Sequence, residues 1–153
     1  MRNFSFFKPF DLIVNIFTSF GYFERDSDNE KVIKCVSRSL KSNGYFVIDF
    51  LNKKHLKKNL IPYTLDKNKV KTLMQLRRLK DNSVIKDIMV VKKNDAIYDF
   101  KKYRERIKLY SLSNFRSMFT RYKLKLIKAF GDYDGTTFES QRSPRLILFA
   151  QRA

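Results

Sequence analysis

The chain has 153 residues and a mass of 18.4 kDa, which suits one domain with a substantial core. Hydrophobic residues make up 43% and charged residues 31%, with 4 glycines and 3 prolines, which excludes a disordered or collagen-like chain. No apolar run approaches the roughly 18 residues that cross a bilayer, and residues 1–7 are too interrupted for a signal peptide. The single cysteine, Cys35, excludes an internal disulfide and an all-cysteine zinc site. We expect a cytoplasmic protein without a metal site.

The positive charge is concentrated in one part of the chain. The net charge is +18, and residues 51–128 hold 23 basic and 6 acidic side chains, whereas residues 1–50 hold 7 and 6. One interpretation is a non-catalytic module that binds RNA or DNA. The other is that lysine, 21 of the 33 basic residues, only solvates exposed strands and loops. Zinc-finger, RNA-recognition and basic-heptad patterns are absent from the sequence, so we do not favour nucleic acid as the partner.

The first fifty residues predict a strand, a helix and a second strand. Phe10–Phe17 is a nearly continuous apolar run, which suits a strand buried on both faces of a parallel sheet. Ser27–Glu30 has the Ser-x-x-Glu pattern of a capping box and predicts a helix start. The predicted apolar stripe of this helix is Val32, Ile33, Val36 and Leu40. Lys41–Gly44 predicts the helix end and Tyr45–Leu51 a second buried strand, which completes a right-handed βαβ unit.

The middle of the chain predicts an antiparallel meander. From Val70 to Tyr110 the segments alternate between apolar and polar residues, as strands with one wet face do. Turn clusters divide these segments at Lys80–Ser83 and Lys92–Asp95.

The last part predicts a helix and two strands. Ser111–Asn114 predicts the helix start. The expected apolar side of that helix is Leu112, Phe115, Phe119 and Tyr122. Strands are predicted at Leu124–Phe130 and Arg145–Ala150, with an acidic, turn-rich loop at Gly131–Gly135 between them.

The order of these elements and several local strings resemble the C-terminal half of a class I S-adenosylmethionine-dependent methyltransferase. The strings are FDLIVNIFTSFGYF (10–23), Asp28-Asn29, LKSNGYF (40–46), RERIKLYS (104–111), and GDYDG (131–135) before SPRLI (143–147). The resemblance covers essentially the whole chain and points to a subgroup of small bacterial enzymes. It implies a Rossmann-like α/β sheet in which these four strands are the fourth, fifth, sixth and seventh. In the family's order, 3-2-1-4-5-7-6, they lie side by side as 4-5-7-6.

The same resemblance implies the organisation and the activity. Residues 1–153 would form a single partial domain: a βαβ half of the sheet (1–52), an inserted basic antiparallel meander (53–110), and a last helix with a strand pair (111–153). The family transfers a methyl group from S-adenosylmethionine to an acceptor, which we expect to be a small molecule.

The glycine-rich cofactor loop of the family has no counterpart in this sequence. Close backbone approach to a cofactor needs closely spaced glycines, and the four present are Gly21, Gly44, Gly131 and Gly135. Met1-Arg2 resembles the stretch after the family's third strand. We therefore expect a fragment that lacks the N-terminal cofactor half and is inactive alone, so that S-adenosylmethionine binding by this chain by itself is in doubt.

The expected partner follows from the sheet. With strands one to three absent, one edge of Phe10–Phe17 would be bare and apolar, which invites pairing with another chain. We expect a complementary N-terminal half, which would complete a methyltransferase in trans, or a homodimer through strand 10–17, and no membrane.

Candidate cofactor contacts lie at the carboxyl end of the first predicted strand. By resemblance, Asn15, Phe17 and Thr18 would flank the methionine moiety and the transferred methyl group of S-adenosylmethionine. The alternative is an ordinary strand end. Methyl transfer is an in-line displacement in which the protein positions the reactants and excludes water, so no catalytic residue is assigned.

Further residues are candidates for binding the acceptor. They are Phe20, Tyr22, Asp49, Arg104, Tyr110, Asp132 and Arg145. The structural alternatives are that Phe20 and Tyr22 close a core and that Asp49 is a hydrogen-bonded structural carboxylate. For Arg104 and Tyr110 the alternative is a salt-bridged strand face, and for Asp132 and Arg145 it is a turn stabilised by Asp side-chain bonds. His55, which has no neighbouring carboxylate or second histidine in the sequence, is a weak candidate for a general base.

Overall fold

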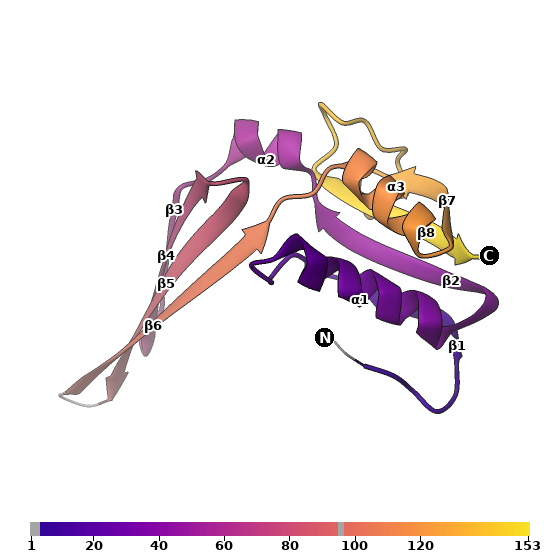
Figure 1. Cartoon of the computed structure of the whole chain (residues 1–153). Coiled ribbons are helices and arrows are strands. Elements are labelled where there is room, and N and C mark those ends of the chain that lie inside the picture. The colour runs from indigo at the N-terminus through magenta and orange to yellow at the C-terminus, as the bar shows by residue number, and fades with distance from the viewer. Residues whose placement is uncertain (1–3, 95–96) are drawn as a thin grey trace.

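A computed structural model describes residues 4–94 and 97–153, so Met1, Arg2 and Asp95 of the predictions above lie outside it. The described residues form two four-stranded sheets and three helices. Figure 1 shows one sheet with two helices lying against it and a long antiparallel ribbon that extends away from it. Among the described residues, the helices are all too short or too polar to span a bilayer.

The first sheet has the strand order expected from the resemblance. β1 (Phe10–Asn15), β2 (Leu40–Leu51), β8 (Arg145–Arg152) and β7 (Leu124–Phe130) lie side by side in that order. β1 pairs in parallel with β2, and the other two pairs are antiparallel. The parallel pair is joined by α1 (Asp26–Ser39). The predicted βαβ unit and the 4-5-7-6 arrangement are confirmed.

The hydrophobic core lies on one face of this sheet, under α1 and α3 (Leu112–Arg121) (Figure 1). Alternate residues of β2 and β8 point to this face, because side chains alternate along a strand. The fully buried members are Phe46, Ile48, Phe50, Leu146 and Leu148, which pack with Ile33, Phe115 and Phe119. α3 begins where predicted, and the structure shows a capping box there, with Ser111 and Asn114 bonded to each other's backbone.

The opposite face and one edge of the sheet are uncovered among the described residues. Leu12 and Val14 of β1 are 52% and 53% exposed, and Tyr45 of β2 stacks on Phe149 of β8 at a centroid distance of 5.0 Å. β1 pairs with β2 alone and therefore has one free edge in the described structure. The interpretation of this apolar run as a strand buried on both faces is therefore wrong for the described structure, in which most β1 side chains are exposed.

Two sequence predictions for α1 are wrong. The helix begins at Asp26 after Arg25, which makes no side-chain capping bond, so Ser27 does not open a capping box. The Asn29 side chain bonds instead to the backbone of Phe23, both to its amide and to its carbonyl oxygen, and ties the preceding loop to the helix. The helix ends at Ser39, and Leu40, predicted within it, is the first residue of β2.

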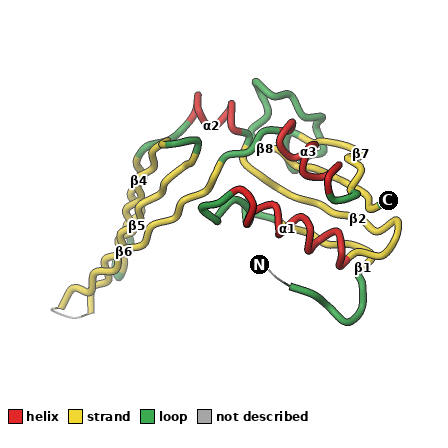
Figure 2. The backbone as a smooth tube through the Cα atoms, viewed as in Figure 1, coloured by secondary structure: helices red, strands yellow, loops and turns green. Residues whose placement is uncertain are grey.

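The second sheet is the predicted meander with one strand more. It consists of β3 (Tyr63–Lys67), β4 (Lys71–Lys80), β5 (Ser83–Asn94) and β6 (Ile97–Lys108), in chain order and antiparallel (Figure 2). The short helix α2 (Lys53–Asn59), which precedes it, was not predicted, because its seven residues carry too few apolar side chains to form a helical stripe.

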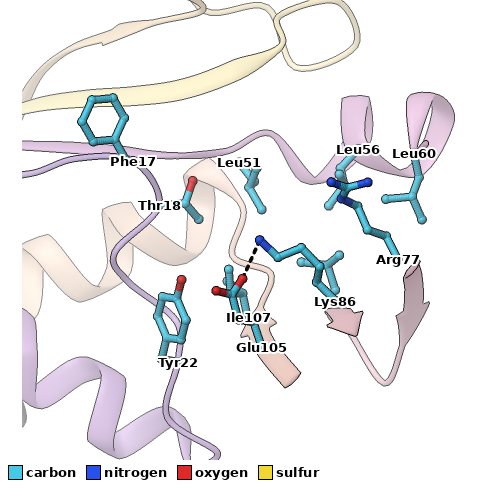
Figure 3. A pocket seen from close by; sticks show the side chains of 11 residues that line it. Phe17, Thr18, Tyr22, Leu51, Leu56, Leu60, Arg77, Lys86, Glu105 and Ile107 are labelled. Atoms are coloured by element: carbon cyan, nitrogen blue, oxygen red, sulfur yellow. Dashed lines mark ion pairs between the residues drawn. The ribbon is translucent and has the colours of Figure 1, made fainter. Parts of the chain in front are cut away.

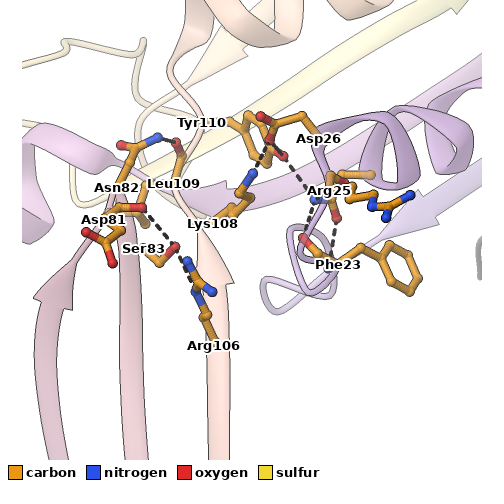
Figure 4. Close-up of polar contacts among 11 residues, drawn as sticks. Phe23, Arg25, Asp26, Asp81, Asn82, Ser83, Arg106, Lys108, Leu109 and Tyr110 are labelled. Carbon is orange, nitrogen blue, oxygen red and sulfur yellow. Dashed lines mark hydrogen bonds and ion pairs between the residues drawn. The ribbon is translucent and has the colours of Figure 1, made fainter.

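Contacts of Lys108 attach the end of β6 to the loop and helix that follow β1; Figure 4 shows its ion pair with Asp26. The Lys108 amide donates to the Gly21 carbonyl oxygen at 2.8 Å, whereas the Leu109 amide donates to the Asn82 carbonyl oxygen, at the base of the meander, at 2.9 Å. Gly21 has a φ of 90°, and a Cβ there would lie 2.8 Å from the Lys108 carbonyl oxygen, so only glycine allows this approach. Lys108 also pairs with Asp26 at 2.8 Å. These contacts position the meander beside the loop that follows β1.

Candidate functional site

The turn that follows β1 has an unusual backbone conformation. Phe17 and Thr18 have φ angles of 55° and 58°, in the left-handed region that non-glycine residues rarely enter. Asp49 holds both residues: the Phe17 amide donates to its Oδ2 at 2.9 Å, and the Thr18 amide donates to its carbonyl oxygen at 3.2 Å. Backbone strain of this kind persists where the surroundings enforce it, and it gathers at functional sites. The turn also lies at the carboxyl end of a parallel strand, where open α/β sheets bind ligands.

Asp49 is the centre of a buried polar cluster. Its side chain is 2% exposed, and Arg145 donates to its Oδ1 from Nε at 2.8 Å and from Nη2 at 2.6 Å. The Tyr133 hydroxyl donates to Oδ2 at 2.8 Å, and Arg145 Nη2 also donates to Thr18 Oγ1 at 2.9 Å. Partial burial and the hydrogen bond to Asp49 raise the pKa of Tyr133. With the Phe17 amide included, four donors occupy the carboxylate, which suits the structural alternative for Asp49.

A cavity of about 280 Å³ lies between this turn and the base of the meander (Figure 3). Phe17, Thr18 and Tyr22 line it on one side, with Leu56 of α2 and Leu60, the residue that follows α2. The remaining lining residues are Leu51 of β2 and Arg77, Val84, Lys86, Glu105 and Ile107 of the meander. The cavity therefore joins the strained turn to the end of β2, to α2 and to three strands of the meander, β4, β5 and β6.

Three charged side chains of the cavity form one row across the meander. The strand register sets Arg77 opposite Lys86 and Lys86 opposite Glu105, so the three share a face. Lys86 Nζ pairs with Glu105 Oε2 at 2.7 Å. Burial and the nearby Glu105 raise the pKa of Tyr22, so its hydroxyl keeps its proton and can donate a hydrogen bond to a ligand.

The structure brings several predicted site residues together. Phe17, Thr18 and Tyr22 line the cavity. Arg145, which is paired with Asp49, donates a hydrogen bond to Thr18. Asn15 lies at the end of β1, and its Oδ1 is buried without a hydrogen-bond partner in the part of the chain that the structure describes. A buried acceptor without a donor costs about 1–3 kcal/mol, which makes Asn15 a candidate for accepting a bond from a ligand.

Other predicted site residues lie elsewhere. Phe20 is buried in the core with its ring 5.5 Å from that of Tyr110, whose hydroxyl donates to Asp26. Burial and Asp26 raise the pKa of Tyr110. Arg104 is on the face of β6 opposite to the cavity, because the neighbouring Glu105 faces it.

The polar contacts of the remaining candidates are local. Arg104 pairs with Asp87, and the hydrogen bonds from Arg104 and Arg78 lower the pKa of Asp87 to about 2. The Asp132 side chain accepts from the amide of Tyr133, its neighbour in the Gly131–Gly135 loop. His55 contacts Asn59 one turn along α2 and does not line the cavity.

Sequence reasoning missed Arg77, Lys86, Leu56 and Leu60 as site residues. Arg77 and Lys86 occur among many basic residues of the meander, and only the strand register distinguishes the two that face the cavity. The position of α2 was unknown because the helix was not predicted. The signal for the register is the Asp81-Asn82 turn, whose two residues both have positive φ. A two-residue turn of this kind sets Lys80 opposite Ser83, and this fixes the pairing of β4 with β5.

Comparison with known proteins gives a match in structure and none in sequence. No protein-family model and no curated protein matches the chain. A S-adenosylmethionine-dependent methyltransferase from Clostridium acetobutylicum matches with a TM-score of 0.84 and 17% identity, over 99% of this chain and 62% of its own. The CcbJ methyltransferase from Streptomyces caelestis matches with a TM-score of 0.76 and 11% identity, over 95% and 62%. The sugar N-methyltransferase KedS8 from a Streptoalloteichus species matches with a TM-score of 0.76 and 12% identity, over 98% of this chain and 59% of its own.

The strand order and these matches define the fold. The chain has the fold of part of a class I S-adenosylmethionine-dependent methyltransferase, with an antiparallel sheet between β2 and β7. It spans between 59% and 62% of the length of the three solved structures named above.

Proposed function

We propose that this chain forms the acceptor-binding part of an S-adenosylmethionine-dependent methyltransferase acting on a small molecule. The observation that carries the proposal is the coincidence of a methyltransferase fold with a strained turn and a cavity at the carboxyl end of β1. That edge is where the ligand site of an open α/β sheet lies.

The chemistry needs positioning more than reactive groups. A sulfonium methyl group is electrophilic by itself, so the protein has to align an acceptor with it and exclude water. The Asp49 cluster supplies the alignment by fixing Phe17 and Thr18. The apolar side chains of Leu51, Leu56 and Ile107 supply the exclusion of water.

Two observations support a small molecule as the methyl acceptor: the acceptors named for similar enzymes and the size of the cavity. Among the structurally similar enzymes, KedS8 is a sugar N-methyltransferase and CalS10 from Micromonospora echinaspora is an amino pentose methyltransferase. The cavity size, about 280 Å³, supports a small acceptor for this chain as well.

The free edge of β1 is proposed to pair with further polypeptide, from the same gene product or from a separate chain. Support comes from the solved methyltransferases, which are longer than this chain, and from the exposed Leu12, Val14 and Tyr45 beside that edge. Such polypeptide would add strands to β1, cover this apolar face and supply the glycine-rich part of the cofactor site.

The cofactor part of the proposal is tested by ligand-observed nuclear magnetic resonance. S-adenosylhomocysteine is mixed with the chain, and adenosine serves as the matched ligand without the amino acid portion. We expect saturation transfer to the homocysteine methylene protons and none to adenosine, because the β1 turn is expected to contact the methionine side. Binding is expected to be weak, because the glycine-rich part of the cofactor site is assigned to further polypeptide. Equal transfer to adenosine, or none to either ligand at the highest soluble concentration, would contradict the proposed contact between the β1 turn and the methionine side.

A second candidate function, binding of a nucleic acid, rests on another cavity. It measures about 490 Å³, and its lining includes Lys53, Lys54, Lys57 and Arg116 and no acidic residue. A steep fall in oligonucleotide affinity with salt, reduced by Lys54→Ala and Lys57→Ala together, would support this candidate. Affinity unchanged by the double substitution would remove it.

A further inference from the structure

One cation of the cavity beside Phe17 and Thr18 has no acidic partner within residues 4–94 and 97–153. Arg77 donates from Nη1 to Thr64 Oγ1 at 3.2 Å and from Nη2 to Gln75 Oε1 at 2.7 Å. Both acceptors are neutral, so these bonds orient the guanidinium without neutralising it. A guanidinium has five N–H donors, and those that remain can bind a planar anion.

The other charges of the cavity cancel each other. Lys86 pairs with Glu105 at 2.7 Å, and among the described residues that line the cavity these two and Arg77 are the charged ones. The net charge of the lining is therefore +1. A protonated amine would meet a net positive field there, whereas an anion would be attracted.

The charged and apolar parts of the lining are arranged for an amphipathic ligand. Figure 3 shows the Arg77 guanidinium beside Leu56 and Leu60, with Thr18 and Tyr22 on the other side of the cavity. A ligand with an anionic group at Arg77 would lay an apolar body along Leu56 and Leu60. Its other end would approach the turn at Thr18.

We propose that this cavity binds a small carboxylic acid with an apolar body, whose carboxylate is held by Arg77. As far as the ligand is taken to be the methyl acceptor, this inference rests on the proposed function. Arg77 is then a specificity-determining residue, because it selects an acid over an alcohol or amine of the same shape.

The test uses hexanoate, with hexan-1-ol and hexylammonium as uncharged and cationic matches, in ligand-observed nuclear magnetic resonance without any methyl donor. We expect hexanoate to bind most tightly. Arg77→Gln should weaken hexanoate binding about ten-fold or more, since hydrogen bonds to a charged group are lost. Arg78→Gln removes the same charge from the next residue, whose side chain pairs with Asp87 away from the cavity, and should leave hexanoate binding unchanged.

Three results would overturn the inference: equal weakening by Arg77→Gln and Arg78→Gln, hexylammonium binding as tight as hexanoate, or hexanoate binding no tighter than hexan-1-ol. Arg77→Lys covers the case in which Arg77→Gln does not fold, and is expected to lose affinity because a lysine lacks the planar fork. The acid experiment contains no methyl donor, so its failure removes only the acid as ligand. Failure of the S-adenosylhomocysteine experiment removes only the proposed cofactor contact at the β1 turn and leaves the anion site.

Discussion

The carboxylate of Asp49 lies 2.6 Å from the guanidinium of Arg145, and through this pair the carboxyl-terminal end of β2 supports the turn at the end of β1. The same guanidinium donates to Thr18, and the same carboxylate accepts from the Phe17 amide. One buried ion pair thus fixes two residues in left-handed conformations at the proposed ligand site.

Asp49→Asn is expected to lower the free energy of unfolding by about 3 kcal/mol, because it leaves the Arg145 charge buried without its partner. The measurement is urea denaturation followed by circular dichroism. Asp11→Asn is the matched control, since Asp11 pairs with Lys41 but is 83% exposed, and it should change the stability by less than about 1 kcal/mol. Equal losses in the two variants would show that the buried pair has no special role.

Phe17→Gly is expected to be better tolerated than a glycine at another exposed phenylalanine. Glycine relieves the left-handed strain of about 1–2 kcal/mol at Phe17, which offsets the entropy that it adds to the unfolded chain. Phe7, which is 100% exposed and has no positive φ, is the matched position. Denaturation of both variants should find Phe17→Gly the more stable by about 1 kcal/mol; the reverse order would mean that the turn is not strained.

Asp87 contributes stability that depends on pH. Its pKa of about 2 is lower than the ordinary value because of hydrogen bonds from Arg104 and Arg78. A depressed pKa means that the stabilisation is present above pH 4 and is lost as the pH falls toward 2. The difference in melting temperature between the wild type and Asp87→Asn should therefore shrink across this interval, and a difference that stays constant would argue against the ion pairs.

Val14→Lys is expected to reduce association of the chain with itself. Val14 is 53% exposed on the free-edge strand, and a lysine there disfavours pairing with a second edge. Val70→Lys, at a residue 60% exposed before β4, is the control. Sedimentation velocity should show fewer oligomers for Val14→Lys alone. If the wild type is a monomer at tens of micromolar, roughly the range of such experiments, the apolar edge does not drive association.

The sheet was predictable from the sequence, because its strands are apolar runs long enough to be recognised. Phe10–Phe17 and Tyr45–Leu51 flank a helix, and that order fixes a parallel pair. The start of α1 could not be predicted from the Ser27–Glu30 pattern. No capping box forms there, and the Asn29 side chain bonds instead to the loop that precedes the helix.

The residues that line the cavity could not be predicted from the sequence, because they depend on the strand register. A shift of one residue in a strand moves a side chain to the other face, so Arg104 and Glu105 look equivalent in the sequence although only Glu105 lines the cavity. The role of Asp49 likewise depends on Arg145 and Tyr133, which approach it from more than eighty residues away.

The most direct test of the account is a titration of the ¹⁵N-labelled chain with S-adenosylhomocysteine, followed through its backbone amide signals. The account predicts that the amides of Asn15 to Ser19 shift first, and that Thr18→Val weakens the effect while Thr72→Val on the meander does not. Amide shifts confined to other parts of the chain, or none at saturating ligand, would contradict the proposal that this turn receives the methyl donor.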